Sequence, residues 1–271
     1  MVKRILAGTL AALVLVGCGG SGNSGTAFAF GVDAAPDQTG ISITANGSTV
    51  LSNASFTTPS PQWISVSSGT NATIFATNSA GQQYAGGLYP PGFISGNYYY
   101  MYAYGNNNTT GQLAVLPIDV SPPAAGTCRV MFVNVSANQQ TASVDVYLNP
   151  STAVAPTPPA TAFGINANNS GATTQAEFNN IPPNTYNVYF CLAGTQTVVA
   201  SYPNVTLGST LTGAGENVIQ VIAMTDAPGT TRTVTQQALA PIVVTPVTGT
   251  SSPLPSVRPF IFSGSKVISK G

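Results

Sequence analysis

Histidine is absent from this sequence, and charged residues make up only 5% of it. Without histidine, neither a Ser-His-Asp nor a Cys-His catalytic arrangement can form, and the common zinc sites lose their nitrogen ligand. Five basic residues remain once Lys3 and Arg4 are set aside, and they form no basic patch, which argues against nucleic-acid binding. We therefore expect a protein that is not an enzyme and that uses no metal or cofactor.

The N-terminal apolar run is too short to cross a bilayer. Ile5–Gly17 follows Lys3 and Arg4 and has 13 residues, whereas a membrane-spanning helix takes about 20. A charged start before a short apolar core predicts a secretory signal peptide over residues 1–17. Leu15-Val16-Gly17-Cys18 resembles the bacterial lipobox, which implies that Cys18 is lipidated and becomes the first mature residue. The alternative is an ordinary signal peptide whose cysteine is incidental.

The residues after the apolar run predict how the protein is held at the membrane. Residues 18–26 contain mostly Gly, Ser and Asn and no charge, which is typical of a flexible tether. Several acyl chains anchor a protein stably, because each buried methylene contributes about 0.8 kcal/mol. Gly19 stands where an Asp would resemble an inner-membrane retention signal. We expect an outer-membrane lipoprotein, on the periplasmic face or the cell surface, whose membrane contact is this lipid anchor.

Gly, Pro, Asn, Thr and Ser are abundant and separate short runs of Val, Ile, Tyr and Phe. Val144, Val146 and Leu148 alternate with Asp145 and Tyr147, which is the period of a half-buried strand. Such strands, joined by Gly/Pro/Asn turns and without an amphipathic helix, predict an all-β fold. We expect two tandem antiparallel β-sandwich domains, immunoglobulin-like or transthyretin-like, after the lipoprotein signal peptide.

The two domains are predicted from an internal repeat. FGVDAAPDQTGISITA aligns with FVNVSANQQTASVDVYL, with Val32 on Val133 and Gly40 to Ile43 on Ser143 to Val146. Further on, Gly69 aligns with Asn184 and Phe75 with Phe190. The expected boundaries are repeat 1 over 27–120, a linker over 121–126, repeat 2 over 127–227 and a Pro/Thr/Ser-rich tail over 228–271, which is either an added strand at a sheet edge or a mobile extension.

Cys128 and Cys191 are the cysteines left once Cys18 carries the lipid. In an oxidising compartment they predict a disulfide bond within repeat 2; two separate buried thiols are the alternative. The repeat alignment places Cys128 opposite Ala27 and Cys191 opposite Ala76. Both cysteines are therefore replaced together in repeat 1, as expected of a bonded pair.

Several of these motifs resemble one known family. Arg129-Val130, Asn134-Val135-Ser136, Val144-Asp145-Val146-Tyr147 and Pro183-Asn184-Thr185-Tyr186-Asn187-Val188 are similar to the bacterial family called domain of unknown function 4397. The resemblance covers about residues 28–226 and implies exported, often lipid-anchored proteins with tandem sandwich domains, without an established activity. Repeat 1 departs from the pattern, because the Asp-Val pair of the strand is lost there.

Tyr98, Tyr100, Tyr102 and Tyr104 are the first candidate site. In a strand these four side chains share one face, and an exposed four-Tyr face is a platform for stacking sugars or a protein partner. If the face is buried, it belongs to the core. The mainly apolar counterpart NVIQVIA in repeat 2 favours the core.

Carboxylates provide two further candidates. Asp33 and Asp37 predict either a weak calcium site, as in a calcium-stabilised adhesin, or a turn in which Asp bonds its own backbone. Repeat 2 carries Asn134 and Asn138 at these positions, which favours the turn. A carbohydrate-processing or accessory enzyme would instead need two scattered acids, such as Asp145 and Glu177, to converge in a cleft.

The function expected from these observations is a lipid-anchored, non-catalytic module of the cell envelope. It binds an envelope protein or a glycan, or serves as a scaffold. The enzyme and the calcium-stabilised adhesin are the alternatives.

Overall fold

The computed structural model describes residues 25–105, 111–118, 126–136, 144–150, 164–167, 174–207, 219–226, 234–236, 260–263 and 266–268. Every regular element in these ranges is a β-strand, so the all-β prediction is confirmed. Within them no helix is long and apolar enough to cross a membrane. The signal peptide, Cys18 and Asn138 lie outside the described residues, as do most of the tether and of the linker.

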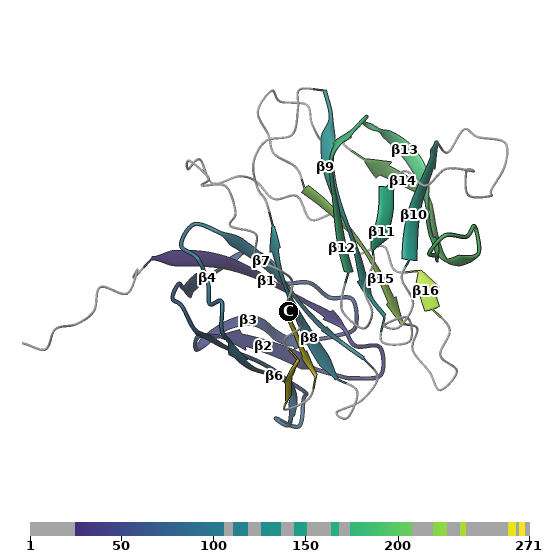
Figure 1. The fold of residues 1–271 in the computed structure, drawn as a ribbon. Helices are drawn as coiled ribbons and strands as arrows, with labels where there is room; N and C mark the ends of the chain where they lie inside the picture. Colours follow the sequence, from purple (N-terminus) through teal and green to yellow (C-terminus); the bar gives the residue numbers. More distant parts are fainter. Residues whose placement is uncertain are drawn as a thin grey trace, which may run out of the picture.

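Repeat 1 is a sandwich of two sheets (Figure 1). One sheet has the strand order β8-β7-β1-β4, with bounds Gln112–Ile118, Tyr98–Tyr104, Thr26–Ala34 and Ile64–Ser67. The other has the order β3-β2-β5-β6, with bounds Ser48–Ala54, Ile41–Ala45, Ala72–Thr77 and Gln83–Tyr89.

Repeat 2 reproduces this topology strand for strand. Its first sheet has the order β16-β15-β9-β12, with bounds Val234–Gln236, Ile219–Asp226, Cys128–Val135 and Thr174–Ile181. Its second sheet has the order β11-β10-β13-β14, with bounds Gly164–Ala167, Val144–Pro150, Asn184–Leu192 and Val198–Leu207. The eight strands of each repeat correspond in order, which agrees with the duplication seen in the sequence.

Neither repeat is antiparallel throughout. The first and seventh strands of each run parallel, β1 beside β7 and β9 beside β15. Phe28 pairs with Tyr98 in repeat 1, and Arg129 pairs with Ile219 at the same place in repeat 2. Parallel neighbours need a long crossover connection, and in each repeat the five intervening strands supply it.

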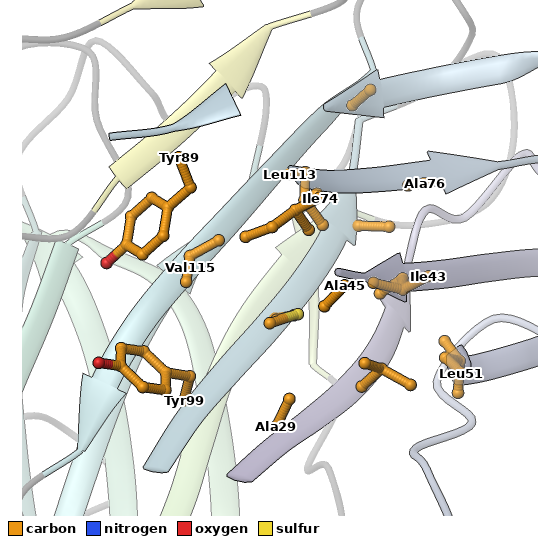
Figure 2. Packing of buried hydrophobic residues seen from close by; sticks show 14 of the residues in the cluster. Ala29, Ile43, Ala45, Leu51, Ile74, Ala76, Tyr89, Tyr99, Leu113 and Val115 are labelled. Atoms are coloured by element: carbon orange, nitrogen blue, oxygen red, sulfur yellow. The ribbon is translucent and has the colours of Figure 1, made fainter. Parts of the chain in front are cut away.

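Each sandwich has its own apolar core. In repeat 1 the alternating residues Ile41, Ile43 and Ala45 of β2 face Ala27 and Ala29 of β1 across a cluster that Figure 2 shows from close by. The described core of repeat 2 contains Cys128, Val130 and Phe132 of β9 with Val144, Val146, Leu148, Tyr186, Val188 and Phe190 of the opposite sheet. The strand period of two thus selects which residues enter each core.

The tail returns to repeat 1. β17 (Phe260–Ser263) pairs antiparallel with β8, and β18 (Lys266–Ile268) pairs with β17, which extends the first sheet to six strands. Phe260 lies opposite Val115, and Ser263 lies opposite Gln112. The outer edge of β8 is therefore covered by a strand from the far end of the chain.

Candidate functional site

The four tyrosines of β7 lie at the junction of the two repeats and not on a surface. Their exposed fractions are 5% for Tyr98, 0% for Tyr100 and Tyr102, and 1% for Tyr104. They pack with Met131, Val133 and Val135 of repeat 2 in one buried cluster. The binding platform is therefore wrong, and the alternative that the sequence favoured, a buried tyrosine face, is confirmed: this face is the core of an interdomain interface.

We define the interdomain interface as the buried cluster that both repeats share. Repeat 1 contributes alternate residues of β1, β7 and β8, and repeat 2 contributes alternate residues of β9: Phe30, Val32, Ala34, Tyr98, Tyr100, Tyr102, Tyr104, Ala114, Leu116, Ile118, Met131, Val133 and Val135. The opposite faces of β1, β7 and β8 fill the core of repeat 1, and the opposite face of β9 fills the core of repeat 2, so these strands are buried on both sides. Burial on both sides explains why β7 and β9 read as nearly continuous apolar runs.

Trp63 lies at the rim of this interface, partly buried against it. Its ring centroid is 5.0 Å from that of Tyr98, at 86°, and 5.3 Å from that of Tyr100. Edge-to-face and tilted contacts at such distances are favourable arrangements for aromatic rings. The role of Trp63 has no signal in the sequence, because nothing in its neighbourhood predicts a contact with the tyrosine strand.

The interface also contains buried polar atoms that have no hydrogen-bond partner among the described residues. The indole nitrogen of Trp63 and the hydroxyls of Tyr100 and Tyr102 are buried and have no hydrogen-bond partner in the described structure. Burial raises the pKa of both tyrosines above the usual value. A buried unpaired polar group costs about 1–3 kcal/mol, so the interface depends on its apolar and aromatic contacts.

Cys128 and Cys191 are free thiols, and the predicted disulfide bond is wrong. Cys128 points into the core of repeat 2, where its Sγ lies 3.3 Å from the carbonyl oxygen of Ile181. Cys191 belongs to a separate cluster with Tyr147 and Tyr189 on the opposite face of the second sheet. A β-strand places neighbouring residues on opposite faces, and Phe190, not Cys191, faces the core.

The pairing register of the strands explains why the disulfide prediction is wrong. Ile43 pairs with Ala76 in the core of repeat 1, whereas Val146 pairs with Phe190 in the core of repeat 2. Ala76 therefore corresponds to Phe190, and the sequence alignment was displaced by one residue along this strand. A slip of one residue moves a side chain to the other face of a sheet, so the apparent replacement of both cysteines by alanine does not hold.

Asp145 and Tyr147 both hold the turn between β13 and β14. The amide of Gly194 donates to Asp145 Oδ2 at 2.7 Å, and the Tyr147 hydroxyl donates to the carbonyl oxygen of Thr195 at 3.0 Å. Gly194 has a φ of 72°, which favours glycine. The Val-Asp-Val-Tyr motif thus has a structural role: its apolar residues face the core and its polar residues fix a neighbouring turn.

Tyr186 explains the second motif. Its hydroxyl donates to the carbonyl oxygen of Pro182 at 2.9 Å, across the corner that leads into β13. This geometry matches the tyrosine corner of immunoglobulin-like sandwiches, in which a Tyr hydroxyl bonds the backbone a few residues upstream. The two motifs of repeat 2 that most resemble the family, the Val-Asp-Val-Tyr strand and the strand of Tyr186, therefore have structural roles.

The two carboxylate candidates do not form sites. Asp33 is fully buried and Asp37 is exposed; Asp33 Oδ1 accepts the amide of Ala35 at 2.9 Å, which is the turn role. Asp145 lies on the face of β10 that points away from the sheet containing Glu177, so these two residues do not converge. The described residues contain no group of three His, Cys, Asp or Glu that could hold a metal.

One sheet face of repeat 1 remains accessible. We call it the hydroxyl face; it consists of the outward residues of β3, β2, β5 and β6, each exposed or half-buried: Ser42, Thr44, Thr49, Thr73, Phe75, Thr77 and Leu88. Thr49, Thr44 and Phe75 form one row across three strands, and Leu88, at 51% exposure, lies opposite Thr73. The face carries no charge. The alternation in Thr-Ile-Phe-Ala-Thr was the sequence signal that could have revealed it.

The corresponding face of repeat 2 is buried at its tyrosines and at Cys191, whereas Asn149, Asn187 and Ser201 on the same face are half-buried. Tyr147 and Tyr189 are each 5% exposed there, and Cys191 is fully buried. Tyr189 occupies the position that corresponds to Phe75, since Ala76 corresponds to Phe190. Both repeats therefore carry an aromatic ring at this place, and the ring of repeat 1 is the accessible one.

Known proteins resemble this chain over part of its length. No curated protein matches the chain. A solved structure that resembles it is a family 26 carbohydrate-binding module from Eubacterium rectale Amy13K in complex with maltoheptaose, at 12% identity over 79% of this chain and 97% of that one. The TM-score of 0.24 is too low for this likeness to support a fold or a ligand.

The family model that matches is the one described as domain of unknown function (DUF4397), over residues 31–147. This range begins in β1, covers the rest of repeat 1 and ends at Tyr147, so it includes the Val-Asp-Val-Tyr strand and stops short of the Tyr186 corner. The match is shorter than the range expected from the sequence, but it confirms the resemblance. Over residues 31–147 the chain is therefore similar to the DUF4397 family.

Proposed function

We propose that this protein is a lipid-anchored module of the bacterial cell envelope that acts through its surface and not through catalysis. The hydroxyl face carries this proposal, because it presents a half-buried aromatic ring, Phe75, and an exposed apolar side chain, Leu88, among hydroxyl groups. The N-terminal motif ending in Cys18 supports the anchor. The use of Asp33 and Asp145 in turns supports a role without chemistry.

The hydroxyl face has the composition of a neutral binding surface. Phe75 offers an aromatic ring, and Thr44, Thr73 and Thr77 offer hydroxyls that donate and accept hydrogen bonds. Because the described residues of this face carry no charge, the face is suited to a neutral glycan or to an uncharged part of an envelope protein, and not to an ionic ligand. The interdomain interface joins the repeat that carries this face to β9 of repeat 2.

Crosslinking in living cells tests the binding role. A photoreactive amino acid at position 75 is expected to crosslink an envelope protein. If the ligand is a glycan, added neutral polysaccharide is expected to suppress crosslinking at this position. The same group at Val198, which is 42% exposed on repeat 2, is the matched control and is expected to capture less. Equal capture at the two positions contradicts a binding role for the hydroxyl face.

A separate experiment tests the anchor. Growth with radiolabelled palmitate is expected to label the wild-type protein and not the Cys18→Ser variant, and outer-membrane fractions are expected to contain the labelled protein. Labelling that survives the substitution would contradict lipidation at Cys18.

A further inference from the structure

Asp33 carries an oxygen that the fold does not use. Its side chain is fully buried near the end of β1, and it shares the inward face of that strand with Ala27 and Ala29. Oδ1 accepts the Ala35 amide, whereas Oδ2 is buried without a hydrogen-bond partner among the described residues. A buried polar atom left unpaired needs an explanation.

Repeat 2 shows that the turn does not require a carboxyl group. Asn134 occupies the corresponding position, and its Oδ1 accepts the amide of Ser136 at 3.1 Å, two residues along, as Asp33 Oδ1 does for Ala35. An amide cannot ionise. Repeat 1 thus keeps an ionisable group at a place where the neutral residue makes the same bond.

The described residues around Asp33 offer no positive charge that would pair with an ionised Asp33 carboxylate. On the inward face, β7 contributes Tyr99, Met101 and Ala103, and β3 contributes Val50 and Leu51. The described parts of β2, β3, β4 and β8 and of residues 55–60 contain no charged residue, and the titratable side chains of β7 are tyrosines. Asp37, in the following loop, is exposed.

A strained segment closes over this end of β1. Thr57 has a φ of 68°, which is unfavourable for a β-branched residue. Its amide donates to the Asp33 carbonyl oxygen at 2.7 Å, and the Asp33 amide donates to the Thr58 carbonyl oxygen at 3.3 Å. Ser60 continues the contact: its hydroxyl accepts the Gly31 amide at 2.9 Å. Residues 57–60 are therefore held by the strand that contains the buried acid.

We propose that Asp33 is a proton-dependent latch: its neutral carboxyl group keeps residues 57–60 closed on β1, and loss of the proton favours release of this segment. An isolated carboxylate in an apolar core is strongly unfavourable. Residues 57 and 58 bond the backbone of Asp33 itself, so their separation from β1 would admit water beside the charge. This regulatory device is independent of the proposed binding role, because β1 belongs to one sheet of the sandwich and the hydroxyl face belongs to the other.

The direction of the pH effect follows from burial. Burial raises the pKa of Asp33 from its ordinary value of 3.8 to about 7, against a smaller lowering by the Ala35 amide. The folded state therefore binds more protons than the unfolded state between these two values. Stability is then greatest below about pH 4, decreases as the pH rises to about 7, and changes little from this group above that.

The test compares urea unfolding of the full chain, wild type and Asp33→Asn, between pH 5 and pH 8. The wild-type ratio of folded to unfolded protein is expected to fall by up to about tenfold per pH unit below pH 7, whereas the variant loses this dependence. Asp37→Asn, a change at the exposed neighbour, keeps the wild-type slope. Equal slopes in wild type and Asp33→Asn overturn the proposal.

Two measurements on the wild type locate the effect and remain available if a variant fails to fold. Infrared spectroscopy at pH 6 is expected to show a protonated carboxyl band that disappears above pH 8. Hydrogen exchange of the Thr57 and Ser60 amides is expected to accelerate over the same range more than that of amides in β5. An absent carboxyl band at pH 6, or uniform acceleration across repeat 1, contradicts the latch.

Discussion

At the scale of single residues, Cys191 shows how strongly one position in a strand determines a role. Its neighbour Phe190 faces the core of repeat 2, while Cys191 lies beside Tyr147 and Tyr189 on the other face. Burial raises the pKa of both Cys128 and Cys191 to about 11. A thiol with a raised pKa contains little of the reactive thiolate at neutral pH, so both cysteines are expected to be inert in the folded protein.

Alkylation measures this expectation. Iodoacetamide is expected to modify neither Cys128 nor Cys191 at pH 7 in the native protein and to modify both after unfolding in urea without a reductant. Mass spectrometry of the tryptic peptides counts the modified residues, and the same protein reduced before unfolding is the control. A peptide pair linked by a disulfide bond in the unreduced sample would contradict the structure.

Asp145 provides a second prediction at this scale. Asp145→Ala removes the acceptor for the Gly194 amide and leaves that turn without its bond. Hydrogen bonds to charged groups contribute about 1.5–3 kcal/mol, and we expect a loss of this size in the free energy of unfolding. Asp145→Asn keeps one oxygen that can accept the amide and is expected to lose less. Equal losses for both variants in urea unfolding would show that the bond to Gly194 contributes little.

At the scale of strands, the sequence is a good guide where residues alternate and a poor one where partners are distant. The pattern in Val144 to Leu148 predicts both the strand and its inward face, and the repeat predicts two sandwiches. The parallel pairing of β1 with β7 is not encoded in either strand alone. The apolar counterpart of the tyrosine strand in repeat 2 favours burial of this face, but the sequence does not predict that repeat 2 covers it, because a four-Tyr face has the same period whatever covers it.

The pairing of β17 with β8 depends on residues more than a hundred positions apart, which no local pattern reveals. Removal of residues 260–271 takes away this pairing and exposes the edge of β8. We expect the free energy of unfolding to fall by about 1–3 kcal/mol, as for a few lost hydrogen bonds, and self-association to increase, because open edges pair with other chains.

Thermal unfolding and light scattering measure the two effects of this truncation. Removal of residues 269–271 alone, which leaves β17 and β18 in place, is the control and is expected to match the intact protein. Unchanged stability and unchanged scattering in the longer truncation would contradict a structural role for the tail strand.

At the scale of the whole molecule, the interdomain interface makes two repeats into one unit. It joins three strands of repeat 1 to β9 of repeat 2 through side chains that are almost entirely buried. Two domains that met through a polar contact would move relative to each other by default. Here the shared apolar cluster fixes the geometry, and the unpaired hydroxyls of Tyr100 and Tyr102 limit its stability.

Val133→Asp tests the interface from the side of repeat 2. A carboxylate there costs more than the roughly 2–7 kcal/mol of an unpaired uncharged polar group, so the repeats are expected to separate while each keeps its β-structure. The radius of gyration measured by X-ray scattering is expected to rise, with far-ultraviolet circular dichroism unchanged. Leu88→Asp, a change of the same kind at an exposed position, is expected to alter neither.

The fluorescence of Trp63 is the most direct measurement of the central claim that the tyrosine face is the inside of an interdomain junction. Trp63 is the one tryptophan of the chain and packs against this junction, so its emission reports the junction without a label. We predict emission at short wavelength and weak quenching by acrylamide in wild type and Leu88→Asp, with a shift to longer wavelength and stronger quenching in Val133→Asp. Identical emission and quenching in all three proteins would contradict the burial of the tyrosine face between the two repeats.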